Sequence, residues 1–372
     1  MDLKYSAEEK LLDASVKEFA RDYLRELRAR SLSNPDGRDP AVWKTVVELG
    51  WLAAHISDEF GGLGGSITDA LLIHEGLGAG LMLEPLLSVA LGLRLMTMVL
   101  PSERTSAALE PYLSGAQLCA VAHEETAARG DLGFVQAFAV ENGTGWSFRG
   151  HKCMVLGAPS ADVLLISARV GPAANSPVDV FSVSRAQVSA RLKSCVTLDG
   201  QRSADLELDG LQVPHSARMG SQGCALPALV AAHDFAILEM CADALGAMEA
   251  AIALTAEHLK TRRQFGAPLG SFQVLQHKLA DMIIAAEQAR SIVFYGASGI
   301  DSKEARTRAR AVSAARVRVV ESASTVGMHA VQLHGGIGVT EEHVISHYYR
   351  RLAAFCNRWG GVDWHLARFA AD

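Results

Sequence analysis

The sequence predicts an α+β protein: an N-terminal α-helical domain, a central antiparallel β-barrel or sandwich domain, and a C-terminal four-helix-bundle-like domain. Two observations carry this prediction. Apolar residues recur at helical spacing at both ends of the chain, whereas the middle contains short alternating runs separated by turns. No strand–helix–strand alternation is present, which argues against a doubly wound nucleotide-binding sheet. The predicted domains are therefore 1–114, 115–218 and 219–372.

Local patterns justify each domain in turn. In the first, an amphipathic helix begins near Leu11, and Asp39 followed by Pro40 is typical of a second helix start. In the second, Asn142–Gly145 separates two strand-like runs and predicts a hairpin. In the third, helical patterns cover 226–261, 272–298 and 303–333, and their length indicates a bundle.

Composition excludes several classes of protein. With 49% hydrophobic and 20% charged residues, the chain is globular. Its 35 basic and 41 acidic residues leave no basic excess for nucleic acid, so we expect no such partner. Six scattered cysteines without a CxxC pair indicate reduced thiols, with neither a disulfide framework nor a metal site.

The expected location is the cytoplasm. The first residues, Met1–Tyr5, lack the basic and apolar regions of a signal peptide. The most apolar stretch, Leu86–Leu100, is interrupted by Arg94 and is too short to span a membrane. We therefore expect no membrane span.

Two motifs in the third domain indicate chemistry. The paired glycines Gly335 and Gly336 follow a helical run and would let backbone amides approach a phosphate; alternatively they only cap a helix. Arg262 ends another long helix before a Gly/Pro turn. Its guanidinium suits a pyrophosphate, although basic residues also favour helix C-termini in general.

Together these motifs resemble the acyl-CoA dehydrogenase family. The segments RRQFGAPLGSFQVLQHKLADM (262–282) and HAVQLHGGIGVTEEH (329–343) carry the resemblance, which extends over nearly the whole chain. It implies FAD as cofactor, an acyl-CoA thioester as substrate and desaturation between its α and β carbons. It also implies an electron-transfer flavoprotein as acceptor, and a homotetramer or a heterotetramer with a related subunit.

The resemblance assigns roles to individual residues. Arg262 would bind the FAD pyrophosphate, in the family that of a neighbouring subunit, and Phe265 and Gln273 would lie along the same cofactor. Gln332, Gly335 and Gly336 would meet its adenosine diphosphate half. The loop after the first central strand differs from that of the family, but Glu125 keeps its acidic residue and would also contact the cofactor. His123 and Arg129, in the same loop, are candidate substrate contacts.

His123 and Arg129 also have simpler interpretations. The favoured interpretation of His123 is a loop histidine hydrogen-bonded to backbone, and that of Arg129 is a solvated side chain. The flavin-facing segment departs from the family as well: Lys152–Leu156 lacks the tryptophan and threonine that contact the isoalloxazine ring.

The largest departure from the family pattern concerns the catalytic base. Removing the α-proton of a thioester requires a carboxylate. Ala236 occupies one position where the family carries its glutamate, and Trp359 and Gly360 occupy the other. Glu239, one turn after Ala236, is the candidate replacement.

These departures resemble the branch of the family with steroid or unusual acyl-CoA substrates and paired subunits. The favoured hypothesis is α,β-dehydrogenation of a bulky or unusual acyl-CoA by a subunit whose partner supplies the base. A self-sufficient enzyme that uses Glu239 is the second. The sequence is also compatible with a non-catalytic scaffold subunit without flavin, and with a flavin oxidase relative.

Overall fold

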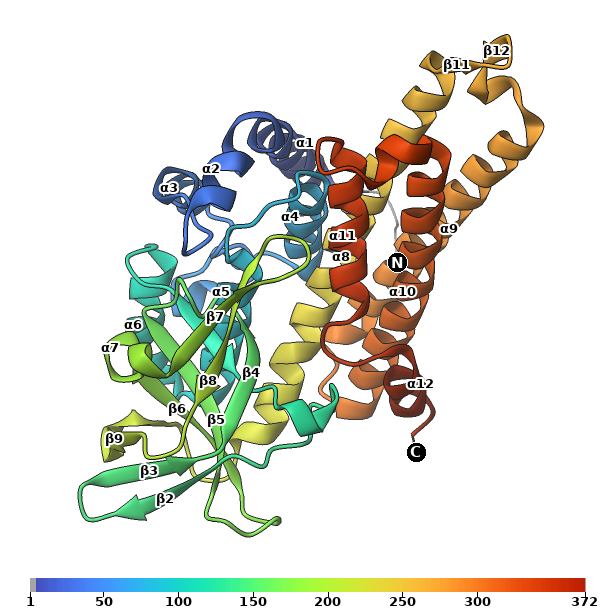
Figure 1. Ribbon diagram of the computed structural model, residues 1–372. Coiled ribbons are helices and arrows are strands. Elements are labelled where there is room, and N and C mark those ends of the chain that lie inside the picture. The colour runs from blue at the N-terminus through green and yellow to red at the C-terminus, as the bar shows by residue number, and fades with distance from the viewer. Residues whose placement is uncertain (1–4, 372) are drawn as a thin grey trace. The chain divides into compact units, whose positions relative to one another are not determined.

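The computed structural model describes residues 5–371 (Figure 1). Met1–Lys4 and Asp372 lie outside them, and with them most of the segment assessed for a signal peptide. The chain forms two compact units. We call residues 1–28, 67–82 and 237–372 the helical unit, and residues 29–66 and 83–236 the sheet unit. The predicted segments 1–114, 115–218 and 219–372 follow the order of helical and strand regions along the chain. Contacts between residues instead group the chain into two units, each made of separate stretches of sequence.

The N-terminal region is helical, as predicted. Asp39 caps the third helix by accepting hydrogen bonds from Ala41 N and Val42 N, with Pro40 as the first helical residue. Ser6 and Glu9 form a capping box before the first. A π-helical turn, Tyr23–Leu27, follows the first helix. The helices are α1 (Ala7–Asp22), α2 (Arg28–Ser33), α3 (Pro40–Glu48), α4 (Ile67–Ala79), α5 (Leu86–Val99) and α6 (Ser102–Leu113).

The central region forms two principal sheets. One has the order β10-β6-β5-β2-β3-β9, with β1 also pairing β5; the other has the order β4-β8-β7. Their strands are β1 (Cys119–Ala122), β2 (Phe138–Asn142), β3 (Gly145–Arg149), β4 (His151–Leu156), β5 (Val163–Val170), β6 (Val178–Ser184), β7 (Leu192–Val196), β8 (Arg202–Glu207), β9 (Gln212–Pro214) and β10 (Arg218–Met219). The short helix α7 (Arg185–Val188) follows β6.

The predicted hairpin is present, because β2 and β3 pair with Asn142 opposite Gly145 and the Asn142 side chain accepts from Thr144 N and Gly145 N. Most strand pairs of the two sheets are antiparallel, as predicted, and two are corrections to that prediction. Strand β5 pairs in parallel with β1 and also with the start of β2. Among the described strands no barrel closes, so the sandwich alternative holds.

The sheet unit has a core of small and aromatic side chains. Phe148 and Phe181 meet edge to face, with ring centroids 4.9 Å apart, and both are fully buried. Apolar residues of the strands pack around them, which explains the alternating pattern seen in the sequence.

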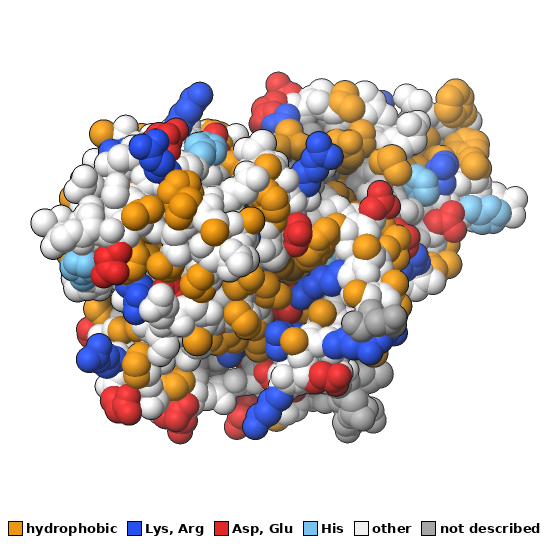
Figure 2. Space-filling model, turned by 90° about the horizontal axis from the view of Figure 1, so that it is seen from below, with side chains coloured by type: hydrophobic (Ala, Val, Ile, Leu, Met, Phe, Trp, Pro, Cys, Tyr) orange, Lys and Arg blue, Asp and Glu red, His pale blue; other side chains and the backbone are white. Residues whose placement is uncertain are grey.

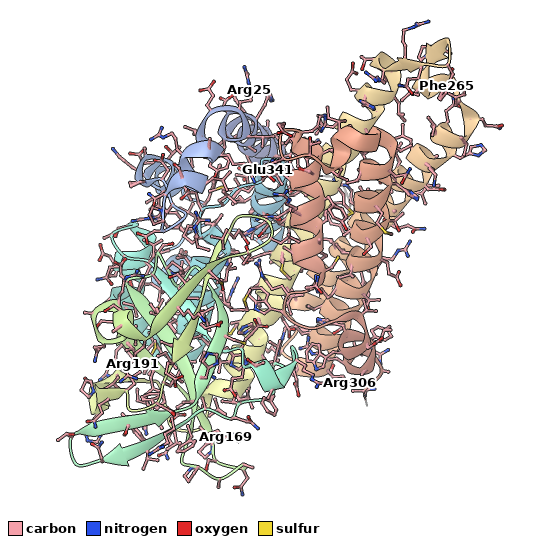
Figure 3. The ribbon with its side chains drawn as sticks, viewed as in Figure 1. Arg25, Arg169, Arg191, Phe265, Arg306 and Glu341 are labelled. Carbon is pink, nitrogen blue, oxygen red and sulfur yellow. The ribbon has the colours of Figure 1, made fainter. Side chains whose placement is uncertain are left out.

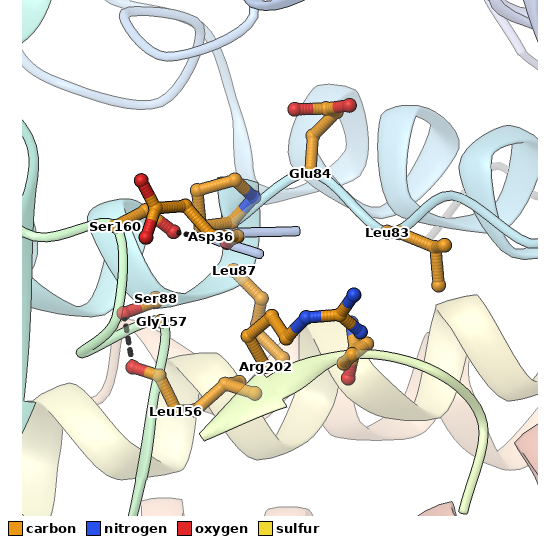
Figure 4. Close-up of a pocket in the computed structure, with 11 residues that line it drawn as sticks. Asp36, Leu83, Glu84, Leu87, Ser88, Leu156, Gly157, Ser160 and Arg202 are labelled. Atoms are coloured by element: carbon orange, nitrogen blue, oxygen red, sulfur yellow. Dashed lines mark hydrogen bonds between the residues drawn. The ribbon is translucent and has the colours of Figure 1, made fainter. Parts of the chain in front are cut away.

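Arg202, at the start of β8, binds the end of α2 and the loop that follows it, which belong to the same unit. Its guanidinium donates to the carbonyls of Leu32, Asn34 and Pro35, and Ser160 Oγ donates to Asp36 O at 3.0 Å. Figure 4 shows Arg202, Ser160 and Asp36 among the residues that line a cavity of only about 10 Å³. Such a space holds at most a single water molecule, so we regard this place as structural.

The C-terminal region is a set of long helices, as predicted: α8 (Ala225–Thr261), α9 (Gln273–Ile300), α10 (Ala305–His334), α11 (Val344–Cys356) and α12 (Val362–Ala370). Two short strands, β11 (Arg263–Gln264) and β12 (Ala267–Pro268), form a hairpin between α8 and α9. Figure 1 shows this hairpin at the far end of those two helices.

Two glycines bring α4 and α8 into close contact within the helical unit. A Cβ at Gly78 would lie 2.0 Å from Asp243 O, and one at Gly246 would lie 1.7 Å from Glu75 O. The helices therefore pack backbone against backbone at this point, which only glycine permits.

The surface mixes charges of both signs. On the face shown in Figure 2, basic and acidic side chains are interspersed among hydrophobic ones. Within residues 5–371, no helix combines the length and the apolar character that a membrane span requires.

Candidate cofactor-binding site

A pocket of about 450 Å³ lies in the helical unit where α8 and α10 end. It brings together four residues that the sequence predicted to share one ligand: Arg262, Gln332, Gly335 and Gly336. The complete lining is His258, Arg262, Gln264, Leu269, Leu275, Gln332, Leu333, His334, Gly335, Gly336 and Ile337.

The turn after α8 positions Arg262. Its N–H donates to His258 O at 2.9 Å, and its carbonyl accepts from Leu269 N at 2.8 Å. The β11–β12 hairpin between these contacts turns at Phe265 and Gly266, which both have positive φ. Local hydrogen bonds thus fix the backbone of Arg262 while its guanidinium remains exposed at the pocket.

The paired glycines form the other side of the pocket. Gly335 ends α10 with φ +67°, and its N–H donates to Gln332 O and Val331 O. The capping interpretation of this motif is therefore correct, but it does not exclude ligand binding. A Cβ at either Gly335 or Gly336 would meet nothing within 4 Å, so the backbone is open toward the pocket.

The residues present fit the diphosphate of a dinucleotide. Arg262 offers two donors at once, Gln332 offers an amide, and the open glycine backbone lets a phosphate approach closely. None of the described residues that line the pocket is acidic, so nothing there repels an anion.

Phe265 and Gln273, the other predicted cofactor residues of this region, lie outside the pocket lining. Phe265 is 87% exposed at the hairpin tip, where Figure 3 shows it beyond the ends of the helices, and it meets Phe272 edge to face. Gln273 is the exposed first residue of α9. Their contact with a cofactor stays a prediction.

Glu125 lies in a buried polar network of the sheet unit. Its Oε1 is 2.7 Å from Lys152 Nζ, and its carboxylate also accepts from Gln136 N and Ala137 N. Lys152 is fully buried, and burial lowers the pKa of its ammonium group although Glu125 opposes this. In this structure Glu125 neutralises Lys152; its cofactor role stays a prediction.

His123 belongs to the same network. Its Nδ1 lies 2.9 Å from Ser167 Oγ and its Nε2 lies 2.9 Å from Leu132 O. Burial lowers its pKa well below the ordinary value, and the neighbouring His233 and Lys152 lower it further. Both ring nitrogens thus have protein partners, while Arg129 is exposed in a turn with φ +50°. Their contact with substrate stays a prediction.

Family models match both ends of the chain. The acyl-CoA dehydrogenase N-terminal domain matches residues 6–115, and the acyl-CoA dehydrogenase C-terminal domain matches residues 234–362. The chain belongs to the acyl-CoA dehydrogenase family. Its members are FAD-dependent flavoproteins, so the predicted cofactor is confirmed for the family.

Individual relatives align with this chain over nearly their whole length. The chain is 26% identical to probable acyl-CoA dehydrogenase YngJ of Bacillus subtilis, covering 94% of this chain and 93% of that one. It is 29% identical to acyl-CoA dehydrogenase IpdE2 of Mycolicibacterium smegmatis, covering 90% and 89%. A solved variant of the Tcur3481-Tcur3483 steroid ACAD is 25% identical with a TM-score of 0.85, covering 97% and 96%.

The family resemblance predicts the catalytic glutamate at one of two positions, and neither carries a carboxylate here. Ala236 is buried in α8. Trp359 is 5% exposed with φ +52°, and its carbonyl accepts from His365 Nε2 at 3.0 Å. Gly360 follows it with φ +93°. A buried aromatic ring thus occupies the position where the family resemblance predicts an acid.

Glu239, the candidate replacement, is 1% exposed in the helical unit. Its Oε2 lies 3.7 Å from Nε2 of His74, on α4. Burial lowers the pKa of His74 to about 4, so this imidazole is neutral at pH 7. Whether Glu239 acts as a base stays a prediction.

His258 and His334 line the same pocket as Arg262 but were not singled out from the sequence. A signal was available for both. His258 precedes Arg262 by four residues, which places both on one helix face, and His334 directly precedes the paired glycines.

Proposed function

We propose that this chain is an FAD-binding subunit of an acyl-CoA dehydrogenase and that a partner chain supplies the catalytic base. One observation supports this most directly. A pocket suited to a diphosphate is retained, while Ala236 and Trp359 stand where a glutamate would be needed. A pure scaffold subunit would have no use for such a pocket.

The chain's own residues would hold the cofactor. Arg262 would bind the diphosphate through its two donors, and Gln332 would orient it. Gly335 and Gly336 would allow its close approach, while Phe265 and Gln273 would lie along it from the neighbouring hairpin. When bound, FAD supplies the acceptor for the hydride lost from the β carbon of the acyl-CoA.

The proposed substrate is a bulky or unusual acyl-CoA thioester, and the proposed acceptor is an electron-transfer flavoprotein. The likeness to a protein described as a steroid ACAD supports the substrate class. The proposed assembly is a heterotetramer with a related subunit, with a homotetramer as the alternative.

Flavin absorption of the purified full-length chain tests this proposal. The chain would be purified alone, and together with a related acyl-CoA dehydrogenase subunit from the same organism. Each sample would be mixed with butyryl-CoA, octanoyl-CoA and a steroid side-chain CoA thioester. We expect flavin bleaching only in the two-subunit sample. Bleaching of the chain alone would refute the need for a partner and return attention to Glu239.

A pair of neighbouring arginines provides the matched test of the pocket. We expect Arg262→Gln to weaken FAD binding roughly 10–100-fold, because a charge-assisted bidentate contact is lost. Arg263→Gln, on the adjacent β11, should leave it unchanged. Equal flavin content in both variants, or no flavin in the unaltered assembly, would contradict the proposed cofactor site and favour the scaffold alternative.

A further inference from the structure

Two stacked imidazoles form one wall of the pocket. The rings of His258, near the end of α8, and His334, the last residue of α10, have centroids 4.4 Å apart and planes 26° apart. A third imidazole, that of His343 before α11, lies 4.9 Å from His334 by ring centroids. Two of the three, His258 and His334, line the pocket directly.

Hydrogen bonds define where two of these rings carry a proton. His334 Nδ1 lies 2.8 Å from Ala330 O, and because a carbonyl only accepts, Nδ1 carries a hydrogen. His343 Nδ1 accepts from Ile345 N at 3.2 Å, so its ring hydrogen is on Nε2. Among the described residues, no side-chain or backbone group forms a hydrogen bond with the His258 ring. Further protons can therefore be taken up at His258 and at Nε2 of His334.

The side chains that shift the pKa values of this pair are all basic. Burial lowers the pKa of His258, and His343 and Arg262 lower it further. Burial also lowers the pKa of His334, which His258 and His343 depress as well while the bond to Ala330 opposes them. In the described part of the chain, no carboxylate is among these influences.

Three acidic residues are close to the histidines along the chain: Glu257 beside His258, and Glu341 and Glu342 before His343. All three are exposed, and none is among the groups that shift the pKa of His258 or His334. Glu341, before α11, is bound by Arg350 and lies 3.7 Å from His347 Nε2. Among the described residues, Arg262 at the end of α8 and His343 before α11 are thus the charged groups that act on the pair. The lining residues from β11, the turn before α9 and α9 itself are uncharged: Gln264, Leu269 and Leu275. A bound dianion would replace mutual repulsion with attraction.

We propose that His258 and His334 are further cofactor-binding residues, which take up protons as the diphosphate of FAD binds. This rests on the proposed function, because it assumes that the pocket takes FAD. Linkage fixes the sign: since the anion favours the protonated imidazoles, FAD binds more tightly as the pH falls.

The dissociation constant of FAD for the full-length chain, in the assembly that binds it, tests this inference. It would be measured from quenching of flavin fluorescence between pH 5.5 and 8.5. One proton taken up per FAD changes affinity by at most about tenfold per pH unit. We expect affinity to fall roughly 3–10-fold between pH 6 and pH 8, and we expect calorimetry in buffers of different ionisation enthalpy to detect proton uptake.

Histidine variants test whether His258 and His334 cause the pH dependence of FAD binding. His258→Gln and His334→Gln should each flatten the pH dependence, while His277→Gln, on the exposed surface of α9, should retain it. Circular dichroism would confirm that the variants fold, and the calorimetry of the unaltered chain needs no variant. The inference about the histidines would be overturned if FAD binding did not depend on pH, or if both pocket variants kept the same pH dependence. Neither result would contradict the proposed function. Absence of FAD binding at every pH would overturn both the inference and the proposed function.

Discussion

Oε2 of Glu239 lies 3.7 Å from Nε2 of His74, across the contact between α8 and α4. Both side chains are less than one-tenth exposed. Gly78 and Gly246 let these helices pack backbone against backbone, so the helices leave little space between them. The two side chains are therefore enclosed between closely packed helices. A general base must reach the substrate proton, and enclosure of this kind favours a structural role for Glu239.

Glu239→Gln should therefore leave catalysis intact. In the two-subunit assembly, we expect the rate of flavin bleaching by acyl-CoA to change less than about twofold, because the amide conserves shape and the base comes from the partner. Stopped-flow absorption would measure this rate. Glu257→Gln, on an exposed part of α8, is the control. A loss of about 100-fold or more in the Glu239 variant alone, the scale of general-base catalysis, would identify Glu239 as the base.

The paired glycines give a prediction that separates stability from binding. Gly336 has open space around its Cβ direction and no positive φ, so Gly336→Ala should leave the melting temperature unchanged. Its methyl group would occupy the pocket, and we expect FAD affinity to fall at least about tenfold. Equilibrium dialysis with FAD and a thermal melt without FAD would measure the two effects.

Gly335→Ala is the matched comparison. Its φ of +67° with ψ −144° is a conformation almost confined to glycine, so strain of roughly 1–3 kcal/mol should lower stability as well as FAD binding. If Gly336→Ala bound FAD normally, the glycine pair would be only a helix cap, and the cofactor assignment of this motif would be wrong.

Patterns local in the sequence predicted the elements well. The helix expected over 226–261 is α8, Ala225–Thr261, because a helical repeat is visible in the sequence over many turns. The hairpin at Asn142–Gly145 was equally local. The parallel pairing of β5 with β1 was missed, because strand alternation shows which face is buried but not which distant strand lies alongside.

The site shows the same contrast between local sequence motifs, which can be recognised, and contacts between distant segments, which cannot. Arg262 and Gly335 were predicted to share a ligand from family motifs, and they do line one pocket. The roles of Glu125 and His123 were harder to predict. Glu125 and His123 lie in the loop after β1, whereas their partners Lys152 and Ser167 lie on β4 and β5. Nothing in the local segments reveals that the fold buries these four side chains together.

Glu125 provides a third prediction, because its carboxylate neutralises a fully buried lysine. Glu125→Gln removes that charge and leaves Lys152 buried without an anion, which should lower the free energy of unfolding by roughly 3–5 kcal/mol. Urea unfolding would measure the loss. The double variant Glu125→Gln with Lys152→Met should recover much of it, since both charges are then gone. Unchanged stability with weakened FAD binding would instead support the predicted cofactor role of Glu125.

Glu84 makes the stability of the sheet unit depend on pH. Its carboxyl group is 3% exposed and accepts from Ser31 Oγ at 2.6 Å and from Asp39 N at 3.1 Å. Burial raises the pKa of Glu84 from 4.5 to about 7; the hydrogen bonds and Arg38 oppose this rise, while the Asp39 carboxylate adds to it. The folded chain therefore binds this proton more tightly than the unfolded chain does.

The sign follows from that difference. The contribution of Glu84 is complete below pH 4.5 and is lost as the pH rises through about 7, with a total of at most about 3 kcal/mol. Glu84→Gln keeps an acceptor oxygen for Ser31 and Asp39 but cannot ionise. We expect the unfolding free energy of this variant, relative to the unaltered chain, to rise by about 2–3 kcal/mol between pH 5 and pH 7.5. Glu103→Gln, exposed on α6, should show no such rise. Parallel curves for Glu84→Gln and the unaltered chain would mean that Glu84 ionises as readily in the fold as in water.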